Sequence, residues 1–166
     1  MICYLGLGSN LGDREALLRA ALKRLAVVPG LRLVRSSSLY ETAPWGGVEQ
    51  GPFLNLVTET ETHLEPTDLL RETQAIEAAL GRVRGERWGP RVVDIDLLLC
   101  GDVQLSTPEL TVPHPLLEAR QFVLVPLAEL APDLPLPSGR TARALAEPGS
   151  PEIALWGPPP WKCRPP

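Results

Sequence analysis

Two aspartates spaced two residues apart are the side chains best placed to do chemistry. Asp94 and Asp96 lie in an otherwise apolar run. Side chains alternate between the faces of a strand, so both carboxylates share one face, roughly 6.6 Å apart along it. The opposite, core-facing side then carries Val93, Ile95, Leu97 and Leu99. Like charges side by side repel each other, so the pattern indicates a bound cation. Mg²⁺ fits, because proteins commonly hold it with one or two carboxylates plus substrate phosphates. The alternative is a solvated strand face.

A cluster of arginines precedes the aspartates. It consists of Arg82, Arg84, Arg87 and Arg91, opposed only by Glu86. A basic cluster in an acidic chain predicts a local site for a small phosphorylated ligand. Arginines that clamp phosphate oxygens and carboxylates that hold Mg²⁺ are recurring parts of phosphoryl transfer. Because the Gly-x-x-x-x-Gly-Lys-Ser/Thr loop is absent, the residues predict an ATP-using transferase outside the P-loop class.

The elements that must position these residues follow a βαββαβ order. We expect strands at about 2–8, 31–40, 53–59 and 93–99, and helices at about 13–27 and 66–80. This order predicts an α+β, ferredoxin-like sandwich with its helices on one face of the sheet. Short C-terminal helices are expected at about 116–120 and 141–147.

Two further groups of residues have plain structural interpretations. Gly6, Gly8 and Gly12 lack the Gly-x-Gly-x-x-Gly spacing, so we interpret them as part of a tight strand-to-helix turn. Gln74 and Glu77 share a face of the second helix. From the residues alone, that face is interpreted as solvated.

A long loop at 41–52, rich in glycine and proline, separates two strands. Loops of this length inside compact domains are usually functional or disordered. Phe53 and Asn55 follow it and share a strand face, so an aromatic ring and an amide emerge together. Farther along the chain, Pro113 and Pro115 bracket His114 in a rigid turn.

The composition is that of one globular domain. The chain has 166 residues, 44% hydrophobic and 22% charged, with a net charge of −4. These values exclude general disorder and argue against nucleic-acid binding. We expect a single domain over 1–147, with a proline-rich tail over 148–166 that is not a separate domain.

Membrane and secretion signals are not found in the sequence. No run approaches the roughly 20 apolar residues that span a bilayer, and the first residues lack the basic lead of a signal peptide. Cys3, Cys100 and Cys163 have no metal-ligand spacing, so we expect Cys3 and Cys100 to be buried, inert thiols. We therefore expect a cytoplasmic monomer that binds small molecules, with neither nucleic acid nor membrane as a partner.

Several stretches together resemble a known family. They are Gly8–Leu11, Ser38–Thr42 with Pro44, Phe53–Asn55, Gly81–Arg84, Glu86–Arg91 with Asp94–Asp96, and Leu110–His114. In order and spacing, over about residues 2–145, they resemble 6-hydroxymethyl-7,8-dihydropterin pyrophosphokinase of folate biosynthesis. The resemblance implies a ferredoxin-like fold and transfer of the β,γ-pyrophosphoryl group of ATP to the pterin hydroxymethyl oxygen, with release of AMP.

The resemblance also implies roles for individual residues. Asp94 and Asp96 correspond to the ligands of two Mg²⁺ ions, and together with Arg82 and Arg91 they form the catalytic set. The implied ATP site comprises Gln74, Glu77, Arg84, Trp88, Arg91, Ile95, Leu97, Thr111 and His114. The implied pterin site comprises Thr42, Ala43, Pro44, Trp45, Phe53, Asn55 and Phe122, with the ring stacked between the two phenylalanines.

Two other classes of protein share some of these features. A different Mg²⁺-dependent nucleotidyltransferase or phosphohydrolase accounts for the aspartates and arginines, but not for a slot that takes a flat ligand. A non-catalytic ferredoxin-like ligand-binding domain has no need for two repelling carboxylates.

Overall fold

The computed structural model describes residues 1–44, 46–47, 49–81 and 91–162. Trp45, Arg82, Arg84 and Trp88 of the expected site lie outside the described residues. The elements are β1 (Ile2–Ser9), α1 (Arg14–Leu25), β2 (Leu31–Ser36), β3 (Leu39–Thr42), β4 (Phe53–Thr62), α2 (Pro66–Ala79), β5 (Asp94–Cys100), β6 (Leu105–Ser106), β7 (Thr111–Val112), a 3₁₀ turn η1 (Leu117–Ala119), α3 (Gln121–Leu130), α4 (Ala142–Leu145) and β8 (Ile153–Gly157).

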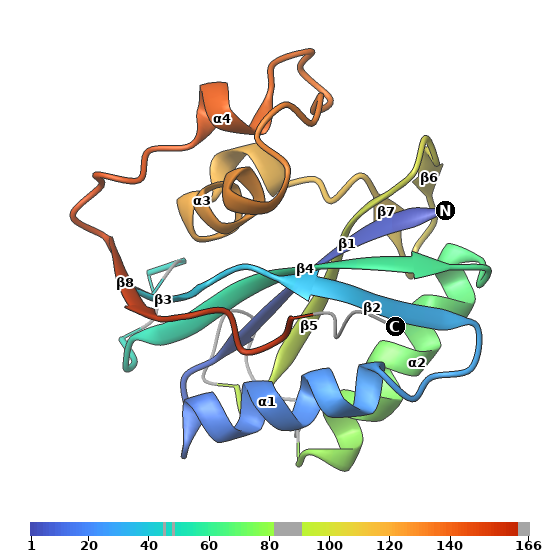
Figure 1. The fold of residues 1–166 in the computed structure, drawn as a ribbon, viewed down its shortest axis with the longest axis horizontal. Coiled ribbons are helices and arrows are strands. Elements are labelled where there is room, and N and C mark those ends of the chain that lie inside the picture. The colour runs from blue at the N-terminus through green and yellow to red at the C-terminus, as the bar shows by residue number, and fades with distance from the viewer. Residues whose placement is uncertain (45, 48, 82–90, 163–166) are drawn as a thin grey trace.

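One antiparallel sheet organises the chain. Its strands run in the order β5-β1-β4-β3-β8, and β2 pairs with β4 as well (Figure 1). β1 is therefore central, between β4 and β5, while β6 and β7 form a separate two-stranded ribbon. The fold is a mixed α and β structure with an antiparallel sheet. Strand β5, which carries the two aspartates, lies at one edge of it.

Helices cover both faces of the sheet. α1 and α2 pack on one face, and α3 with α4 lies over the other (Figure 1). The two helices of the βαββαβ order, α1 and α2, lie on one face as expected. The apolar stretch after Phe122, for which the sequence predicted no helix, forms α3 on the opposite face. There Val123, Leu124 and Leu127 are buried in one cluster with Tyr4 of β1 and Val57 of β4. An apolar helix of this kind is stable because it closes a second core.

The first helix agrees closely with its sequence pattern. The Asp13 carboxylate accepts a hydrogen bond from the backbone N–H of Ala16 at 3.1 Å, which caps the start of α1. The stripe of Leu18, Leu22 and Leu25 is fully buried, as its helical spacing predicted. α1 therefore packs firmly beneath the central strands.

The strand expected at 31–40 is divided into β2 and β3. At the break, the backbone N–H of Val57 donates to the hydroxyl of Ser37 at 3.0 Å. Ser38 donates from both its backbone N–H and its hydroxyl to Glu129 of α3. The backbone N–H of Ser37 still donates to the backbone oxygen of Val57 at 2.8 Å, and the side-chain bonds take the place of further ladder bonds here. As a result, β3 pairs with the start of β4, beside the long loop.

A β-bulge in β5 changes one prediction about the core. Tyr4 pairs with Leu99 but Leu5 pairs with Leu97, so Leu98 is an extra residue. A bulge interrupts the two-residue alternation. Val93, Ile95 and Leu97 lie in the core beneath α1 and α2, as predicted, whereas Leu99 joins Leu98 in the core beneath α3.

The C-terminal segment is partly built into the sheet. Ile153–Gly157, expected within an extended tail, form β8 and pair with β3. Cys3 and Cys100 face each other across β1 and β5 and are fully buried, as expected. Among the helices of the described ranges, none has the length and apolarity needed to cross a membrane.

Candidate active site

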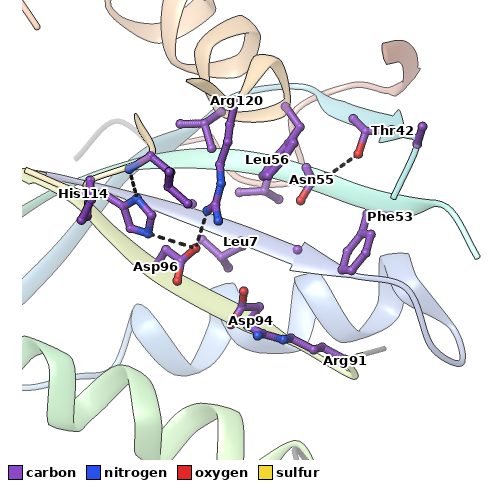
Figure 2. Close-up of a pocket in the computed structure, with 17 residues that line it drawn as sticks. Leu7, Thr42, Phe53, Asn55, Leu56, Arg91, Asp94, Asp96, His114 and Arg120 are labelled. Carbon is purple, nitrogen blue, oxygen red and sulfur yellow. Dashed lines mark hydrogen bonds and ion pairs between the residues drawn. The ribbon is translucent and has the colours of Figure 1, made fainter. Parts of the chain in front are cut away.

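A cavity of about 470 Å³ lies between the sheet and the segment that leads into α3. Its walls come from β1, β3, β4 and β5, and from residues around His114 and Arg120 (Figure 2). We call one side, formed by Arg91, Asp94, Asp96, His114 and Arg120, the charged half. We call the other side, formed by Thr42, Ala43, Phe53, Asn55 and Phe122, the aromatic half.

Asp94 and Asp96 project from β5 into the charged half, on the same face of the strand as predicted (Figure 2). An Arg91 Nη1 lies 2.6 Å from Asp94 Oδ1. An Arg120 Nη1 lies 3.6 Å from Asp96 Oδ2. Each carboxylate therefore has an arginine partner from a different segment of the chain.

The ionised form of Asp96 is disfavoured by its surroundings. Burial in the cavity wall raises the pKa of Asp96 to about 7, and the negative charge of Asp94 acts in the same direction. The positive charges of Arg120 and Arg91 oppose this shift without cancelling it. A pair of carboxylates in this state favours binding a cation, which would stabilise both ionised forms.

His114 is held in one tautomer. The backbone N–H of Leu116 donates to His114 Nδ1 at 3.1 Å, so the ring proton lies on Nε2 (Figure 2). Burial, with the positive charge of Arg120, lowers the pKa of His114 to about 4. Nε2 lies 4.0 Å from Asp96 Oδ2. The neutral imidazole therefore presents an N–H donor to the charged half.

Arg120 is a site residue that the sequence interpretation missed. It is the last residue of the short helix expected at about 116–120, just before the apolar stretch that forms α3. In the structure Arg120 is only 5% exposed, and its guanidinium lies 5.5 Å from the centroid of the Phe122 ring. Since it also faces Asp96, Arg120 links the charged half to the aromatic half.

The aromatic half brings together residues from two neighbouring strands. Phe53 and Asn55 lie on one face of β4, as their spacing predicted, and both line the cavity. The side-chain amide of Asn55 donates to the hydroxyl of Thr42 on β3 at 2.6 Å (Figure 2). Phe122 enters from the start of α3. The result is an apolar slot whose polar edge is already hydrogen-bonded.

Gly6 and Gly8 form part of the cavity floor and do not belong to a turn. Both lie within β1, opposite Asp96 and Asp94 respectively. A Cβ on Gly8 would lie 2.6 Å from Asn55 Oδ1, which is too close for any real contact. The turn interpretation is therefore wrong for these two residues, since the missing side chains make room between the two halves.

Asn10 connects the loops on either side of the cavity. Its carbonyl oxygen Oδ1 accepts from the backbone N–H of Arg91 at 2.8 Å. Its amide Nδ2 donates to Gln50 Oε1 at 2.9 Å and to the backbone oxygen of Gly51 at 3.2 Å. One small side chain therefore holds both Arg91 and the approach to Phe53.

Glu77 is buried, so the interpretation of its helix face as solvated is wrong at this position. Its carboxylate accepts from the backbone N–H of Ile95 at 2.6 Å, whereas Gln74 remains exposed. Ile95 and Leu97 point into the core. The buried carboxylate thus fixes the start of the strand that carries both aspartates.

Two other expected residues lie away from the main cavity. Thr111 lines a neighbouring cavity of about 450 Å³, and His114 borders both cavities. Pro44 is half-buried and lies outside the lining of either cavity. The other described residues of the expected pterin site line the main cavity together.

The fold and the site combine an antiparallel sheet with two carboxylates, each beside an arginine, in the wall of one cavity. A family model described as 7,8-dihydro-6-hydroxymethylpterin-pyrophosphokinase (HPPK) matches residues 4–132. The chain is 51% identical over 144 residues to a 2-amino-4-hydroxy-6-hydroxymethyldihydropteridine pyrophosphokinase of Methylorubrum extorquens, covering 87% of this chain and 91% of that one. It is 50% identical over 137 residues to the Pseudomonas aeruginosa protein of the same name, covering 82% and 85%.

Solved structures show the same fold. Plasmodium falciparum HPPK-DHPS with pteroate superposes with a TM-score of 0.69 at 17% identity, over 87% of this chain. The match spans 41% of that longer chain. The chain therefore belongs to the HPPK family, whose members transfer pyrophosphate from ATP. The resemblance expected from the sequence is confirmed.

Proposed function

We propose that this chain transfers the β,γ-pyrophosphoryl group of ATP to the hydroxymethyl oxygen of 6-hydroxymethyl-7,8-dihydropterin, releasing AMP. One observation carries the proposal. A single cavity of about 470 Å³ joins a slot for a flat ring to a pair of aspartates with arginine partners. The family match supports the same reaction.

The aromatic half takes the pterin in this proposal. Phe53 and Phe122 stack on a flat bicycle, and Asn55 with Thr42 reads its hydrogen-bonding edge. Ala43 borders the slot, and Pro44 and Trp45 complete the proposed set. A ligand lacking the polar edge is rejected, because buried polar groups would lose their partners.

The charged half takes the phosphates. Asp94 and Asp96 suit Mg²⁺, because hard oxygen donors and the raised pKa of Asp96 favour a divalent cation there. Two bound ions would neutralise the triphosphate during an in-line displacement. Arg91 and Arg120 neutralise further charge, and the Nε2–H of His114 donates to a phosphate oxygen. Arg82, which lies outside the described residues, remains part of the proposed catalytic set.

The remaining residues of the proposed ATP site lie on and around β5. Glu77 binds the Ile95 N–H and so holds the strand in place. Gln74, Thr111 and the backbone at Ile95 and Leu97 are proposed to contact the nucleoside. Arg84 and Trp88, outside the described residues, stay in the proposed ATP set.

We also propose a ferredoxin-like core. The order β5-β1-β4-β2, with α1 and α2 on one face, supports that description. Residues 1–147 remain the proposed domain. A cytoplasmic monomer remains our expectation.

A single assay tests the reaction. The protein is incubated with ATP, Mg²⁺ and 6-hydroxymethyl-7,8-dihydropterin, and the nucleotides are then separated. We expect AMP only when the pterin is present. Formation of ADP, or hydrolysis that does not need the pterin, would instead indicate a phosphohydrolase or nucleotidyltransferase. Binding without turnover would indicate a ligand-binding domain.

A further inference from the structure

The C-terminal strand β8 is joined to the aromatic half of the cavity. β8 pairs along β3, with Ile153 opposite Thr42. The backbone N–H of Ala43 donates to the backbone oxygen of Glu152 at 3.0 Å. Thr42 and Ala43 both line the cavity. One side of the expected pterin slot is thus built on a strand that the C-terminal segment holds.

Arg14 and Trp156 fasten this arrangement from the α1 side. The Arg14 guanidinium lies 5.0 Å from the centroid of the Trp156 ring. Arg14 Nη2 lies 2.8 Å from Glu41 Oε2 on β3, and Nη1 donates to the backbone oxygen of Pro52 at 3.0 Å. Arg14 therefore ties the C-terminal strand to the residues just before Thr42 and just before Phe53.

The Trp156 ring is itself oriented by a second contact. Its Nε1–H donates to Glu15 Oε2 at 3.3 Å. Farther along the segment, the backbone N–H of Ser36 donates to the backbone oxygen of Trp161 at 3.2 Å, and the Trp161 N–H donates to the Ser36 hydroxyl at 3.1 Å. The segment is thus anchored at both ends, and β8 cannot slide along β3.

We propose that Trp156, acting through Arg14, is a positioning residue for the pterin side of the site. This inference rests on the proposed function. Its reach is limited by the topology, because β8 and β5 lie at opposite edges of the sheet with β3, β4 and β1 between them. Trp156 therefore affects the slot at Thr42 and Phe53, and leaves the carboxylates on β5 unchanged.

Steady-state kinetics of the full chain tests the proposal. For Trp156→Ala we expect the KM for the pterin to rise roughly fivefold. This fold-change corresponds to the free energy of a cation–π contact at a partly exposed site. The KM for ATP and kcat should stay near wild type. Trp156→Phe keeps a ring over Arg14 and should restore most of the pterin affinity.

The matched control is Leu155→Ala on the same strand. Leu155 is 69% exposed and has no part in the Arg14 contacts, so its pterin KM should remain at the wild-type value. In an Arg14→Ala background, Trp156→Ala should add little, because residues that act through one another are not additive. Should Trp156→Ala fail to fold by circular dichroism, Trp156→Leu replaces it.

The outcomes separate the two proposals. If wild type makes AMP only with the pterin, but Trp156→Ala keeps both KM values, the positioning role is wrong and Trp156 serves stability alone. An equal rise in both KM values overturns it as well. If wild type makes no pterin-dependent AMP, the proposed function itself falls, and the positioning role with it.

Discussion

The two halves of the main cavity hold their polar groups by different means. In the aromatic half, the bond between Asn55 and Thr42 is a neutral hydrogen bond of 2.6 Å. In the charged half, Asp94 and Asp96 are held by ion pairs to Arg91 and Arg120. A neutral bond can persist when a neutral ring enters. The ion pairs compete with the metal and phosphates that the same groups are proposed to bind.

This difference predicts what each half contributes to binding and to turnover. The aromatic half is preorganised, so it contributes affinity and selectivity for a rigid ring. The charged half must exchange internal partners for ligand charges. Burial, together with the negative charge of Asp94, raises the pKa of Asp96 there. We therefore expect substitutions in the charged half to lower turnover, and substitutions in the aromatic half to weaken pterin binding.

The largest effect is expected for Asp96→Asn. This variant keeps the shape of the side chain but loses the charge that holds a metal, so kcat should fall roughly a thousandfold. AMP formation at saturating substrates measures it. Asp102→Asn is the matched control, because Asp102 is exposed in the turn after β5. Near-normal turnover of Asp96→Asn would contradict the prediction that the charged half determines turnover.

A smaller effect, confined to the aromatic half, is expected for Gly8→Ala. The added Cβ would meet Asn55 Oδ1 at 2.6 Å and must displace it. Overpacking of this kind typically costs about 1–3 kcal/mol. Because the clash falls on a residue of the slot, the pterin KM should rise roughly 5- to 150-fold. The KM for ATP should change little. Gly149→Ala is the control, since a Cβ there meets nothing within 4 Å. A matching loss of ATP affinity would contradict the division.

The smallest effect is a pH dependence of Mg²⁺ binding. With a pKa of about 7, Asp96 is protonated below neutrality and ionised above it. Only the ionised form binds the metal, so affinity should rise roughly tenfold between pH 6 and pH 8. Calorimetric titration of Mg²⁺ with a non-hydrolysable ATP analogue measures this.

The control is the same Mg²⁺ titration of the nucleotide analogue without protein, which includes protonation of the nucleotide and excludes that of Asp96. His114, with its pKa near 4, stays neutral over the same range and does not contribute. A pH curve for the protein that runs parallel to that of the free analogue would show that the carboxylate does not titrate on metal binding.

Local spacing predicted the parts of the site that lie on regular strands. The period of two predicted that Asp94 shares a strand face with Asp96, and Phe53 with Asn55. The same rule failed at Leu99, because a bulge adds a residue that no local pattern marks. It also could not foresee that α3 would close a core on the second face.

The residues that were missed depend on contacts between distant segments. The sequence shows Arg120 only as the end of a short helix, and its contact with Asp96 of β5 depends on the tertiary fold. Gly8 is interpreted as part of a turn until Asn55 of β4 is known to lie beside it. Glu77 is interpreted as solvated, because the sequence does not show that it accepts a hydrogen bond from the Ile95 N–H. Each of these residues gains its role only when the strand order is known.

The hydrogen bond from Leu116 to His114 also limits the proton chemistry of this site. It commits the imidazole lone pair to the backbone, so the ring offers the cavity a proton and no acceptor. The proton lost by an attacking hydroxyl must therefore leave by way of an oxygen, either a carboxylate, a phosphate or water. The neutral histidine therefore acts as a hydrogen-bond donor through its Nε2–H. Because its pKa is about 4, it donates the same hydrogen bond at pH 6 as at pH 8.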